Sequence, residues 1–594
     1  MCEGGKAPRS RRRAGSAAVA IAAATAVAGL AAVLAPGSGG AALLRPAGAA
    51  AAADAPADGA AFVLTREAFR DRLAGGWAGQ MVGVSYGSIY EFVSNGKIIE
   101  GPLRPWRPEF IENSLGQDDL YVEGTFLAAL EKHGPRITPR QAGAAFAASK
   151  YPLWHANDAA RENLRRGIHP PESGHPRSNP HADDIDFQIE ADLFGLIAPG
   201  MPRAAGRLCD TFGGIMNYGD GVYGGRFVAA MYAHAYREPE PTPAAVERCV
   251  LAGLAAIPAD SDYAAVVRDV FDGYRKHPDD WRATWKEIED RWAGTDTCPD
   301  GVGKPFNIDA KLNGAYIVIG LLYGGADWAK TLEISTRCGQ DADCNPSNAA
   351  GVLGALYGLK RIPSEYTAGI AALKGRKFDH TDYDFDGMVD ASEAVARRVV
   401  AAGGGKVGED GSLRLPAERP EPPKRLEQVR AFSEEQRRAW AADFERKRRE
   451  ALVARIPVGE WAPGWRLIKT GTEMDPGLRP LFGEPSVLVT HPVSQSEPAA
   501  LEARVTLPKG SPRLVLSVAS WPEPSNSDWE LRVLADGNEV AREVIHSPGK
   551  WRNVSVDLSR YAGRTVRLRL ENAAGGGSPW SYEGGYWSRI RVEP

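Results

Sequence analysis

The sequence has little cysteine and no marked excess of either charge. Six of the 594 residues are cysteines, too few for a scaffold held together by disulfides. The 71 Lys and Arg residues nearly balance the 75 Asp and Glu residues, which leaves a formal net charge of −4. This balance gives no electrostatic reason to bind a polyanion, so we expect no nucleic-acid partner. With 43% hydrophobic and 25% charged residues, the composition excludes wholesale disorder and a collagen-like fibre.

The long apolar run of the chain lies near the N-terminus. Basic residues between Lys6 and Arg13 precede an almost unbroken series of small and apolar residues over 17–34. This order is typical of an export signal, so we predict a signal peptide over residues 1–50 and a secreted mature protein. A membrane anchor is the competing interpretation. Alanine is a weak bilayer residue, however, and no second such run follows, so we expect no membrane association beyond export.

The mature chain divides into three parts by pattern. Over residues 62–400 apolar residues recur at helical spacing, as in Phe69, Leu73, Trp77 and Met81, which predicts one large all-helical domain. Residues 401–459 combine a segment rich in Gly, Pro and charge with a charged helix, as a linker does. Residues 460–594 alternate apolar and polar residues between turn signals, which predicts an antiparallel β-sandwich. The expected fold is therefore multidomain.

Two acid pairs each precede a predicted helix. They are Asp118 with Asp119, and Asp341 with Asp343. Four carboxylates within a few Å of one another cannot all ionise cheaply without a positive partner, and hard divalent cations are the usual one. We therefore predict a metal site if the fold brings the pairs together. The alternative is that each pair only caps its own helix.

Three segments of the helical region carry a family resemblance. They are Gly75-Gly-Trp-Ala-Gly-Gln-Met-Val-Gly83, Gln117-Asp-Asp119, and Gly339-Gln-Asp-Ala-Asp-Cys-Asn-Pro followed by a Gly/Ala-rich helix to Gly358. Over residues 62–363 the chain resembles the ADP-ribosylglycohydrolase family. The resemblance implies an all-helical bundle that hydrolyses a ribosyl bond with one or two Mg²⁺ or Mn²⁺ ions. It further implies four metal ligands, of which Asp119 and Asp343 are also catalytic: Asp118, Asp119, Asp341 and Asp343.

The chain departs from the family pattern at three positions. Gln117 and Cys344 stand where members commonly have Thr, and Gln80 stands where they commonly have Asp. A thiol is a poor ligand for magnesium. Such changes fit a retained scaffold with a changed substrate, so we expect a glycosidic bond in a small molecule or an oligosaccharide. The alternative function is a non-catalytic, calcium-stabilised secreted protein that binds carbohydrate.

A segment between the acid pairs has the composition of a sugar-binding turn. Glycines interleave with Asn, Asp and Tyr over residues 217–225, after the acidic segment 182–192. Such residues hold sugar hydroxyls by hydrogen bonds and the apolar sugar face by a ring. We predict as substrate-binding residues Asp184, Asn217, Tyr218, Asp220 and Tyr223. The alternative is an ordinary glycine-rich turn with Asx hydrogen bonds. In the same segment, Asp186 and Glu190 would share one helix face.

A calcium-loop pattern follows the helical region. Aspartates at 382, 384 and 386, a glycine and an acid at the twelfth position fit the D-x-D-x-D-G spacing. A structural Ca²⁺ would have as ligands Asp382, Asp384, Asp386 and Glu393. The alternative is a turn that leads into the next helix.

Two weaker motifs favour structural interpretations. The Gly83-Val-Ser85-Tyr-Gly87 run matches a serine-hydrolase elbow, which needs a strand before the serine, whereas a helix is predicted there. We therefore expect that Ser85 is not a nucleophile. Three histidines lie in a Pro-rich segment with Asp183, but their spacing matches no standard zinc site, so we interpret them as loop residues: His169, His175 and His181.

The C-terminal region resembles galactose-binding-like jelly rolls, most clearly over residues 551–564. The resemblance implies a carbohydrate-binding-like module. Its tryptophans are the natural stacking surfaces for sugar rings. The alternative is that they form the core of a small sandwich.

Overall fold

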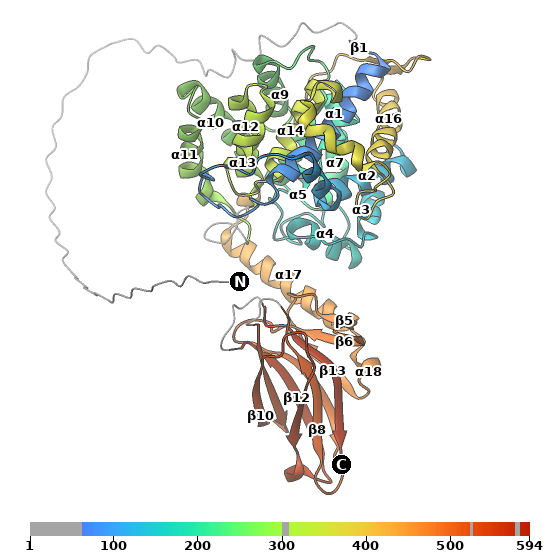
Figure 1. The fold of residues 1–594 in the computed structure, drawn as a ribbon, viewed down its shortest axis with the longest axis vertical. Helices are drawn as coiled ribbons and strands as arrows, with labels where there is room; N and C mark the ends of the chain where they lie inside the picture. The colour runs from blue at the N-terminus through green and yellow to red at the C-terminus, as the bar shows by residue number, and fades with distance from the viewer. Residues whose placement is uncertain (1–61, 300–307, 523–526, 576–581) are drawn as a thin grey trace, which may run out of the picture. The chain divides into compact units, whose positions relative to one another are not determined.

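The computed structural model describes residues 62–299, 308–522, 527–575 and 582–594, so the predicted signal peptide lies outside the described residues. The region after it is helical, which confirms the predicted fold class (Figure 1). Its α-helices are α1 (Arg66–Gly87), α2 (Asp118–His133), α3 (Pro139–Ala147), α4 (His155–Arg165), α5 (Asp186–Ile189), α6 (Asp192–Leu196), α7 (Pro202–Phe212), α8 (Asp220–Ala235), α9 (Pro243–Ala255), α10 (Asp262–Lys276), α11 (Trp281–Trp292), α12 (Ala310–Gly324), α13 (Trp328–Arg337), α14 (Cys344–Tyr357), α15 (Ser364–Thr367) and α16 (Phe385–Ala402).

Helix α1 begins where the sequence predicts. The Thr65 hydroxyl caps it by accepting a hydrogen bond from the Ala68 amide at 3.2 Å. The predicted apolar stripe of α1, represented by Phe69 and Trp77, is fully buried. Burial of such a stripe, more than intrinsic propensity, stabilises a helix of a globular domain.

A second stripe of α1 consists of glycines at every fourth position, residues 75, 79, 83 and 87, and it faces α14. A Cβ on Gly79 would lie 2.7 Å from the carbonyl carbon of Ala350, and one on Gly83 would lie 2.6 Å from Cα of Ser347. No Cβ fits at these distances. The missing side chains therefore let the two helix backbones touch, and this packing fixes the start of α14 beside the end of α1.

A small sheet closes the helical domain and moves its boundary. Strand β1 (Phe62–Leu64) pairs with β3 (Leu413–Leu415), which pairs with β2 (Lys406–Val407), all antiparallel. Both leucines of β3 are buried in the helical core. The domain therefore extends to residue 415, beyond the predicted end at 400, because the chain returns to pair with the strand before α1.

The charged linker helix is α17 (Glu434–Arg455), followed by the short α18 (Val458–Trp461). Phe444 is the buried residue of α17. Ion pairs at helical spacing line its surface, as between Arg446 and Glu450 at 2.7 Å. This is the pattern of a largely solvated connector.

The C-terminal region forms two five-stranded antiparallel sheets, as the strand pattern predicts. Their inner faces meet around Trp529 and Trp587, which are buried and 4.9 Å apart between ring centroids. These tryptophans belong to the core. One sheet has the order β10-β9-β12-β7-β4 and the other β11-β8-β13-β6-β5. The strands are β4 (Trp465–Lys469), β5 (Gly477–Leu481), β6 (Glu484–Thr490), β7 (Ala499–Thr506), β8 (Arg513–Ala519), β9 (Trp529–Ala535), β10 (Asn538–Ile545), β11 (Arg552–Asp557), β12 (Thr565–Ala573) and β13 (Gly585–Glu593).

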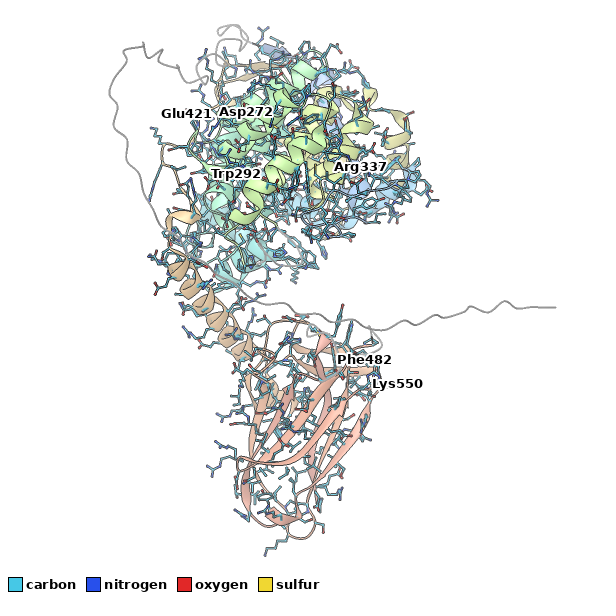
Figure 2. The ribbon with its side chains drawn as sticks, turned by 90° about the vertical axis from the view of Figure 1, so that its left-hand side faces the viewer. Asp272, Trp292, Arg337, Glu421, Phe482 and Lys550 are labelled. Carbon is cyan, nitrogen blue, oxygen red and sulfur yellow. The ribbon has the colours of Figure 1, made fainter. Side chains whose placement is uncertain are left out.

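Further aromatic residues of the sandwich pack on one another at one end. Phe482, labelled with Lys550 in Figure 2, follows β5, and its ring contacts those of Trp551 at 5.9 Å and Tyr586 at 5.3 Å. Trp551 also donates its indole N–H to the carbonyl oxygen of Phe482 at 3.1 Å. These rings stabilise the sandwich itself.

The cysteines of the described residues are buried and unpaired. Within the described ranges, no helix combines the length and the apolar character needed to cross a bilayer.

Candidate functional site

Each predicted acid pair lies at the start of a helix. Asp118 and Asp119 are the first residues of α2. Asp343 caps α14, because its Oδ1 accepts a hydrogen bond from the Cys344 amide at 3.0 Å, and Asp341 Oδ1 accepts from the same amide at 3.3 Å. Helix N-termini favour negative charge. The local sequence therefore explains where each pair lies, but not that the pairs meet.

The two acid pairs come together in the fold. The Cys344 thiol donates to Asp119 Oδ1 at 3.3 Å, which joins residues 225 positions apart. Burial raises the pKa of Asp119 well above its usual range, and the charges of Asp118 and Asp343 raise it further. Asp119, Asp341 and Asp343 are at most 2% exposed. The two pairs therefore form a single carboxylate cluster. The alternative, in which each pair only caps its own helix, does not describe this arrangement.

Two further carboxylates extend the cluster from α5. The amide N–H of Asn157 donates to Asp186 Oδ1 at 2.9 Å, and the Asn157 side chain donates to Glu190. Asp186 is the first residue of α5 and Glu190 follows its last, so the helix is too short to contain both acids. Burial raises the pKa values of both, and the charge of Asp118 adds to the rise. Asn157 was not recognised from sequence, since an asparagine in the first turn of a helix is common.

Two more buried carboxylates, Glu123 and Asp192, lie close to Asp119. Glu123 Oε1 accepts a hydrogen bond from the Leu193 amide at 2.5 Å, and Asp192 accepts from the Tyr232 hydroxyl and from the Asn348 side chain, the latter at 2.6 Å. Burial and the charge of Asp192 raise the pKa of Glu123.

Glu91 is a further carboxylate close to Asp118 and Asp343. Burial raises its pKa to about 8, assisted by the charges of Asp343 and Asp118.

Several buried oxygens of this cluster have no hydrogen-bond donor among the described residues. They are Asp119 Oδ2, Glu123 Oε2, Glu190 Oε2, Asn157 Oδ1, Asn345 Oδ1 and Asn348 Oδ1. Buried polar atoms normally have partners, so a group of orphaned oxygens needs an explanation. Carboxylate and amide oxygens are the ligands that Mg²⁺ and Mn²⁺ prefer. The donor set therefore fits a hard divalent cation.

Most of the predicted sugar-binding residues have structural partners. Asn217 donates to the carbonyl oxygens of Ala182 and Asp184 at 3.0 and 2.8 Å and accepts from the Phe187 amide at 3.0 Å. Asp220 accepts from a backbone amide on α10, and the Tyr223 hydroxyl accepts from the Glu427 amide at 2.7 Å.

Tyr218 packs edge-on against His175 at 4.9 Å. Of the predicted residues, Asp184 lies close to the carboxylate cluster. Burial raises the pKa of Asp184, and the nearby charge of Asp186 raises it further. The contacts of Asn217, Asp220 and Tyr223 support the turn interpretation, since these side chains hold backbone groups.

The predicted calcium loop is wrong. Helix α16 already begins at Phe385, so the last nine positions of the motif are helical. Asp384 is the N-cap, accepting from the Gly387 amide at 2.9 Å, and Asp382 is exposed and pairs with Lys377 at 3.0 Å.

The twelfth residue of the motif has other partners. Glu393 is buried against arginines of α1 and α16, with Arg66, Arg70 and Arg397 at 2.8, 2.9 and 2.6 Å. It therefore cannot face the aspartates. The interpretation as a turn before a helix holds.

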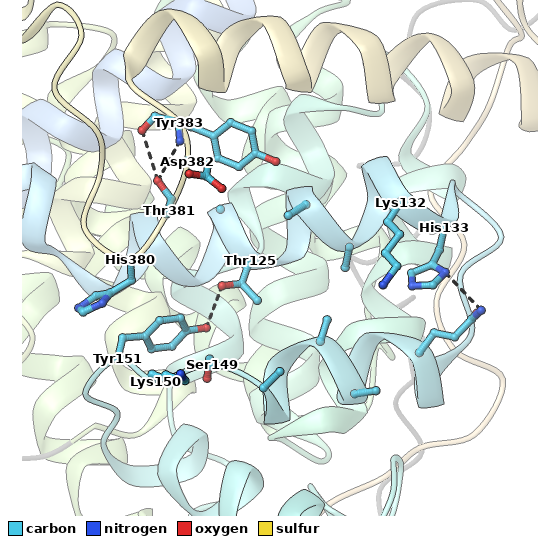
Figure 3. Close-up of a pocket in the computed structure, with 17 residues that line it drawn as sticks. Thr125, Lys132, His133, Ser149, Lys150, Tyr151, His380, Thr381, Asp382 and Tyr383 are labelled. Atoms are coloured by element: carbon cyan, nitrogen blue, oxygen red, sulfur yellow. Dashed lines mark hydrogen bonds between the residues drawn. The ribbon is translucent and has the colours of Figure 1, made fainter.

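Ser85 lies within α1, not at a strand-to-helix turn, as expected. The described structure also has a cavity of about 850 Å³ between α2, α3 and residues 380–383 (Figure 3). Its lining includes Thr125 and Tyr151, whose hydroxyls are 3.1 Å apart. It lacks the carboxylates of the cluster, so we do not identify it with the site.

One comparison with known proteins covers the region that holds both acid pairs. A family model described as ADP-ribosylglycohydrolase matches residues 65–403, which include both acid pairs. Among solved structures, one titled ADP-ribosylglycohydrolase-related protein complex has 18% identity and a TM-score of 0.36, and the match covers 56% of this chain and 99% of that one. Another, titled EclA C-terminal domain and sugar-binding protein, has 12% identity and a TM-score of 0.15 over 18% of this chain and 76% of that one. No curated protein matches.

Proposed function

Because this chain belongs to the ADP-ribosylglycohydrolase family, we propose that it is an exported, metal-dependent hydrolase that cleaves a ribosyl or other glycosidic bond. The substrate class is a small-molecule or oligosaccharide glycoside. The observation that carries the proposal is the meeting of Asp118 and Asp119 with Asp341 and Asp343 in one buried, oxygen-rich cluster.

In this proposal the four aspartates bind metal, and another carboxylate accepts the proton of the attacking water. Asp118, Asp119, Asp341 and Asp343 would hold one or two Mg²⁺ or Mn²⁺ ions, which when bound supply Lewis acidity and make a water more acidic. The burial of Asp119, Asp341 and Asp343 keeps bulk water from these carboxylates and strengthens electrostatic interactions inside the site.

Two carboxylates are candidates to accept the proton of the attacking water. The Glu91 residue still reaches solvent, although partial burial raises its pKa, whereas Glu123 is fully buried and already accepts a hydrogen bond from a backbone amide. A proton acceptor must reach both the water and, afterwards, the solvent. Glu91 meets this requirement better.

A second candidate function has one specific observation in its favour. The Cys344 thiol lies against Asp119 Oδ1, where the family commonly carries a hydroxyl. Sulfur is a poor ligand for magnesium. A helical domain without catalysis, joined to a carbohydrate-binding sandwich, would show sugar binding that survives EDTA and no hydrolysis across a glycoside panel with Mg²⁺ or Mn²⁺.

Asp341→Asn tests the proposal. We expect the variant to lose both the bound divalent ion, measured by elemental analysis, and turnover of the ADP-ribosyl, nucleoside or oligosaccharide substrate that the native protein hydrolyses. Asp382→Asn is the matched control, because Asp382 is an exposed acid outside the cluster. A metal-free Asp341→Asn protein with native turnover would refute the proposal.

A further inference from the structure

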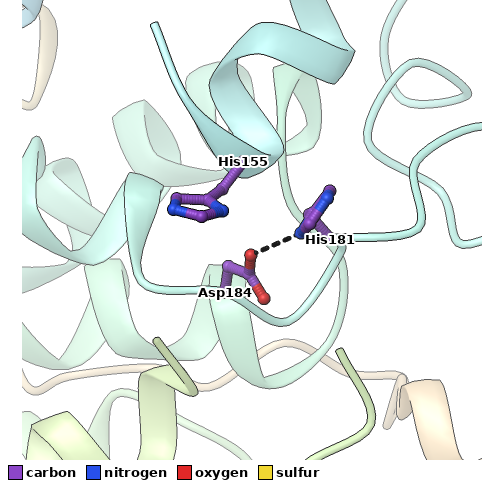
Figure 4. A group of neighbouring side chains, drawn as sticks. All are labelled: His155, His181 and Asp184. Atoms are coloured by element: carbon purple, nitrogen blue, oxygen red, sulfur yellow. Dashed lines mark hydrogen bonds and ion pairs between the residues drawn. The ribbon is translucent and has the colours of Figure 1, made fainter. Parts of the chain in front are cut away.

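Two histidines and an aspartate that are distant in sequence come together beside the carboxylate cluster. His155 is the first residue of α4, and His181 and Asp184 lie in the loop before α5 (Figure 4). His181 Nδ1 is 2.8 Å from Asp184 Oδ2, and the imidazole centroids are 5.4 Å apart. One potential ligand atom from each residue lies within 4.8 Å of the other two.

Two buried asparagines hold the backbone at these three positions. The Asn179 side chain donates to the carbonyl oxygen of Ala156, next to His155, and accepts from the His181 amide at 3.0 Å. Asn217 donates to the carbonyl oxygen of Asp184 at 2.8 Å. Outer contacts of this kind fix the orientation of metal ligands and contribute to affinity. The three side chains therefore start from a preorganised backbone.

Backbone geometry at His155 is also unusual, because its φ is 44°. This is the left-handed region, which costs energy for a residue other than glycine. In Figure 4 the imidazole of His155 lies next to Asp184.

The aspartate is buried beside the two imidazoles. Asp184 is fully buried, and its Oδ2 is the oxygen that faces the histidines, 2.8 Å from His181 Nδ1 (Figure 4). Burial of a carboxylate is costly, and a metal ion at Oδ2 would offset that cost. The imidazoles remain accessible, since the His181 side chain is 16% exposed. An ion can thus enter from the histidine side.

We propose that His155, His181 and Asp184 bind a divalent transition metal, with Zn²⁺ as the best fit, in addition to any ion at the carboxylate cluster. Imidazole nitrogen favours Zn²⁺ over Mg²⁺, and three protein ligands with an open fourth position are typical of catalytic zinc. Ligand atoms around tetrahedral zinc lie about 3.3 Å apart at bond lengths of about 2.0–2.1 Å. Small side-chain rotations therefore complete the site.

A neighbouring thiol is not part of the proposed ligand set. Cys298 lies near Asp183 and Asp184, but its thiol donates to Asp183 Oδ1 at 2.7 Å. Asp183 also accepts from the Thr297 hydroxyl. The thiol proton is therefore used in a hydrogen bond to Asp183, and we expect Cys298→Ser to leave zinc binding unchanged.

The test is calorimetric titration of Zn²⁺ into the EDTA-treated, dialysed full chain in excess Mg²⁺, which saturates oxygen-only sites. We expect one tight Zn²⁺ per chain and, with Co²⁺ instead, a visible absorption spectrum of a nitrogen-containing site without sulfur-to-metal charge transfer. Absence of Zn²⁺ binding under these conditions would overturn the proposal, and so would a charge-transfer band that disappears in Cys298→Ser.

The ligand variants are His155→Asn and His181→Ala. Asparagine tolerates the positive φ at position 155, so His155→Asn retains the fold. Each variant should bind Zn²⁺ more than about 100-fold more weakly, because loss of a ligand exceeds the roughly 10–100-fold effect of losing an outer contact. His169→Ala, which removes an exposed imidazole from the same loop, should bind as the native protein does. Native affinity in both ligand variants would refute the site.

Failure of this proposal is distinguishable from failure of the proposed function. Asp341→Asn should keep its Zn²⁺, because Asp341 is not one of the three ligands. If Zn²⁺ binding is lost in Asp341→Asn and kept in the histidine variants, the ion binds at the carboxylate cluster and the inference is wrong, whatever the enzymatic outcome.

Discussion

Gly87→Ala tests whether the packing of two helices sets the geometry of the acid cluster. Gly87 is the last residue of α1, and a Cβ there would lie 2.5 Å from Cα of Asp343. Carbon atoms in contact are about 3.5–4.0 Å apart. The added methyl must therefore displace the loop of Asp341 and Asp343 by about 1 Å or more.

Metal sites tolerate little displacement. Bond lengths in real sites stay within about 0.2 Å of their ideal values. A shift of about 1 Å in two of the four predicted ligands should lower the affinity for Mn²⁺ by at least about 10-fold. Overpacking itself should cost about 1–3 kcal/mol of unfolding free energy.

Gly75→Ala is the matched control at the other end of the same stripe. Its Cβ would lie 2.8 Å from the backbone nitrogen of Leu359, so the overpacking is similar. The position is about 18 Å along α1 from Gly87 at about 1.5 Å per residue, too far to move the acid cluster. We expect a comparable loss of stability with native Mn²⁺ affinity.

Urea unfolding and calorimetric titration of Mn²⁺ measure the two quantities separately. Native Mn²⁺ affinity in Gly87→Ala, despite the expected loss of stability, would refute the reasoning. Equal losses of affinity in both glycine variants would also contradict it, because the effect would then be general loosening and not displacement of the loop.

Two further predictions follow from buried titratable groups. Burial opposes ionisation of Glu393, but hydrogen bonds from three arginines overcome this and lower its pKa from 4.5 to about 2. Because the folded pKa is below the unfolded value, the stabilisation is full above about pH 4.5 and is lost as the pH falls toward 2. Glu393→Gln should therefore cost about 1–3 kcal/mol at pH 7, after allowance for solvent around the arginines, and little near pH 2 in urea titrations. A difference independent of pH would contradict this, as would stabilisation of the native protein by Ca²⁺ that the variant lacks. Burial also raises the pKa values of the described cysteines, so a thiol reagent should label them only on unfolding, and rapid labelling of the folded chain would show that the thiols are accessible.

Much of the fold follows from local pattern. The apolar spacing from Phe69 to Met81 predicts the buried face of α1, and alternation of apolar and polar residues predicts the sandwich strands. The small sheet was missed, because a three-residue strand such as Phe62–Leu64 acquires its partner only when residues 413–415 return to it. A segment this short carries no periodic signal of its own.

The candidate site also contains residues that local sequence identifies and residues whose partners only the fold decides. Asp118 and Asp343 were identified from local sequence and family resemblance. The calcium motif has the right spacing, yet Glu393 is held by two arginines of α1 as well as by Arg397 of its own helix, and no local rule anticipates the contacts from α1. Asn217 has the right chemistry for a sugar, yet backbone groups take both of its N–H donors and also bind its carbonyl oxygen.

By itself, the sequence determined the long helices, the strands of the sandwich and which residues carry carboxylates, because periodicity and capping act over a few neighbouring positions. Tertiary structure alone decided which of these residues meet. It joined Asp119 to Cys344 and His155 to Asp184, and it committed Glu393 to arginines. The physical reason is that a side chain has few bonds to make, and the fold chooses its partners from residues that are distant along the chain.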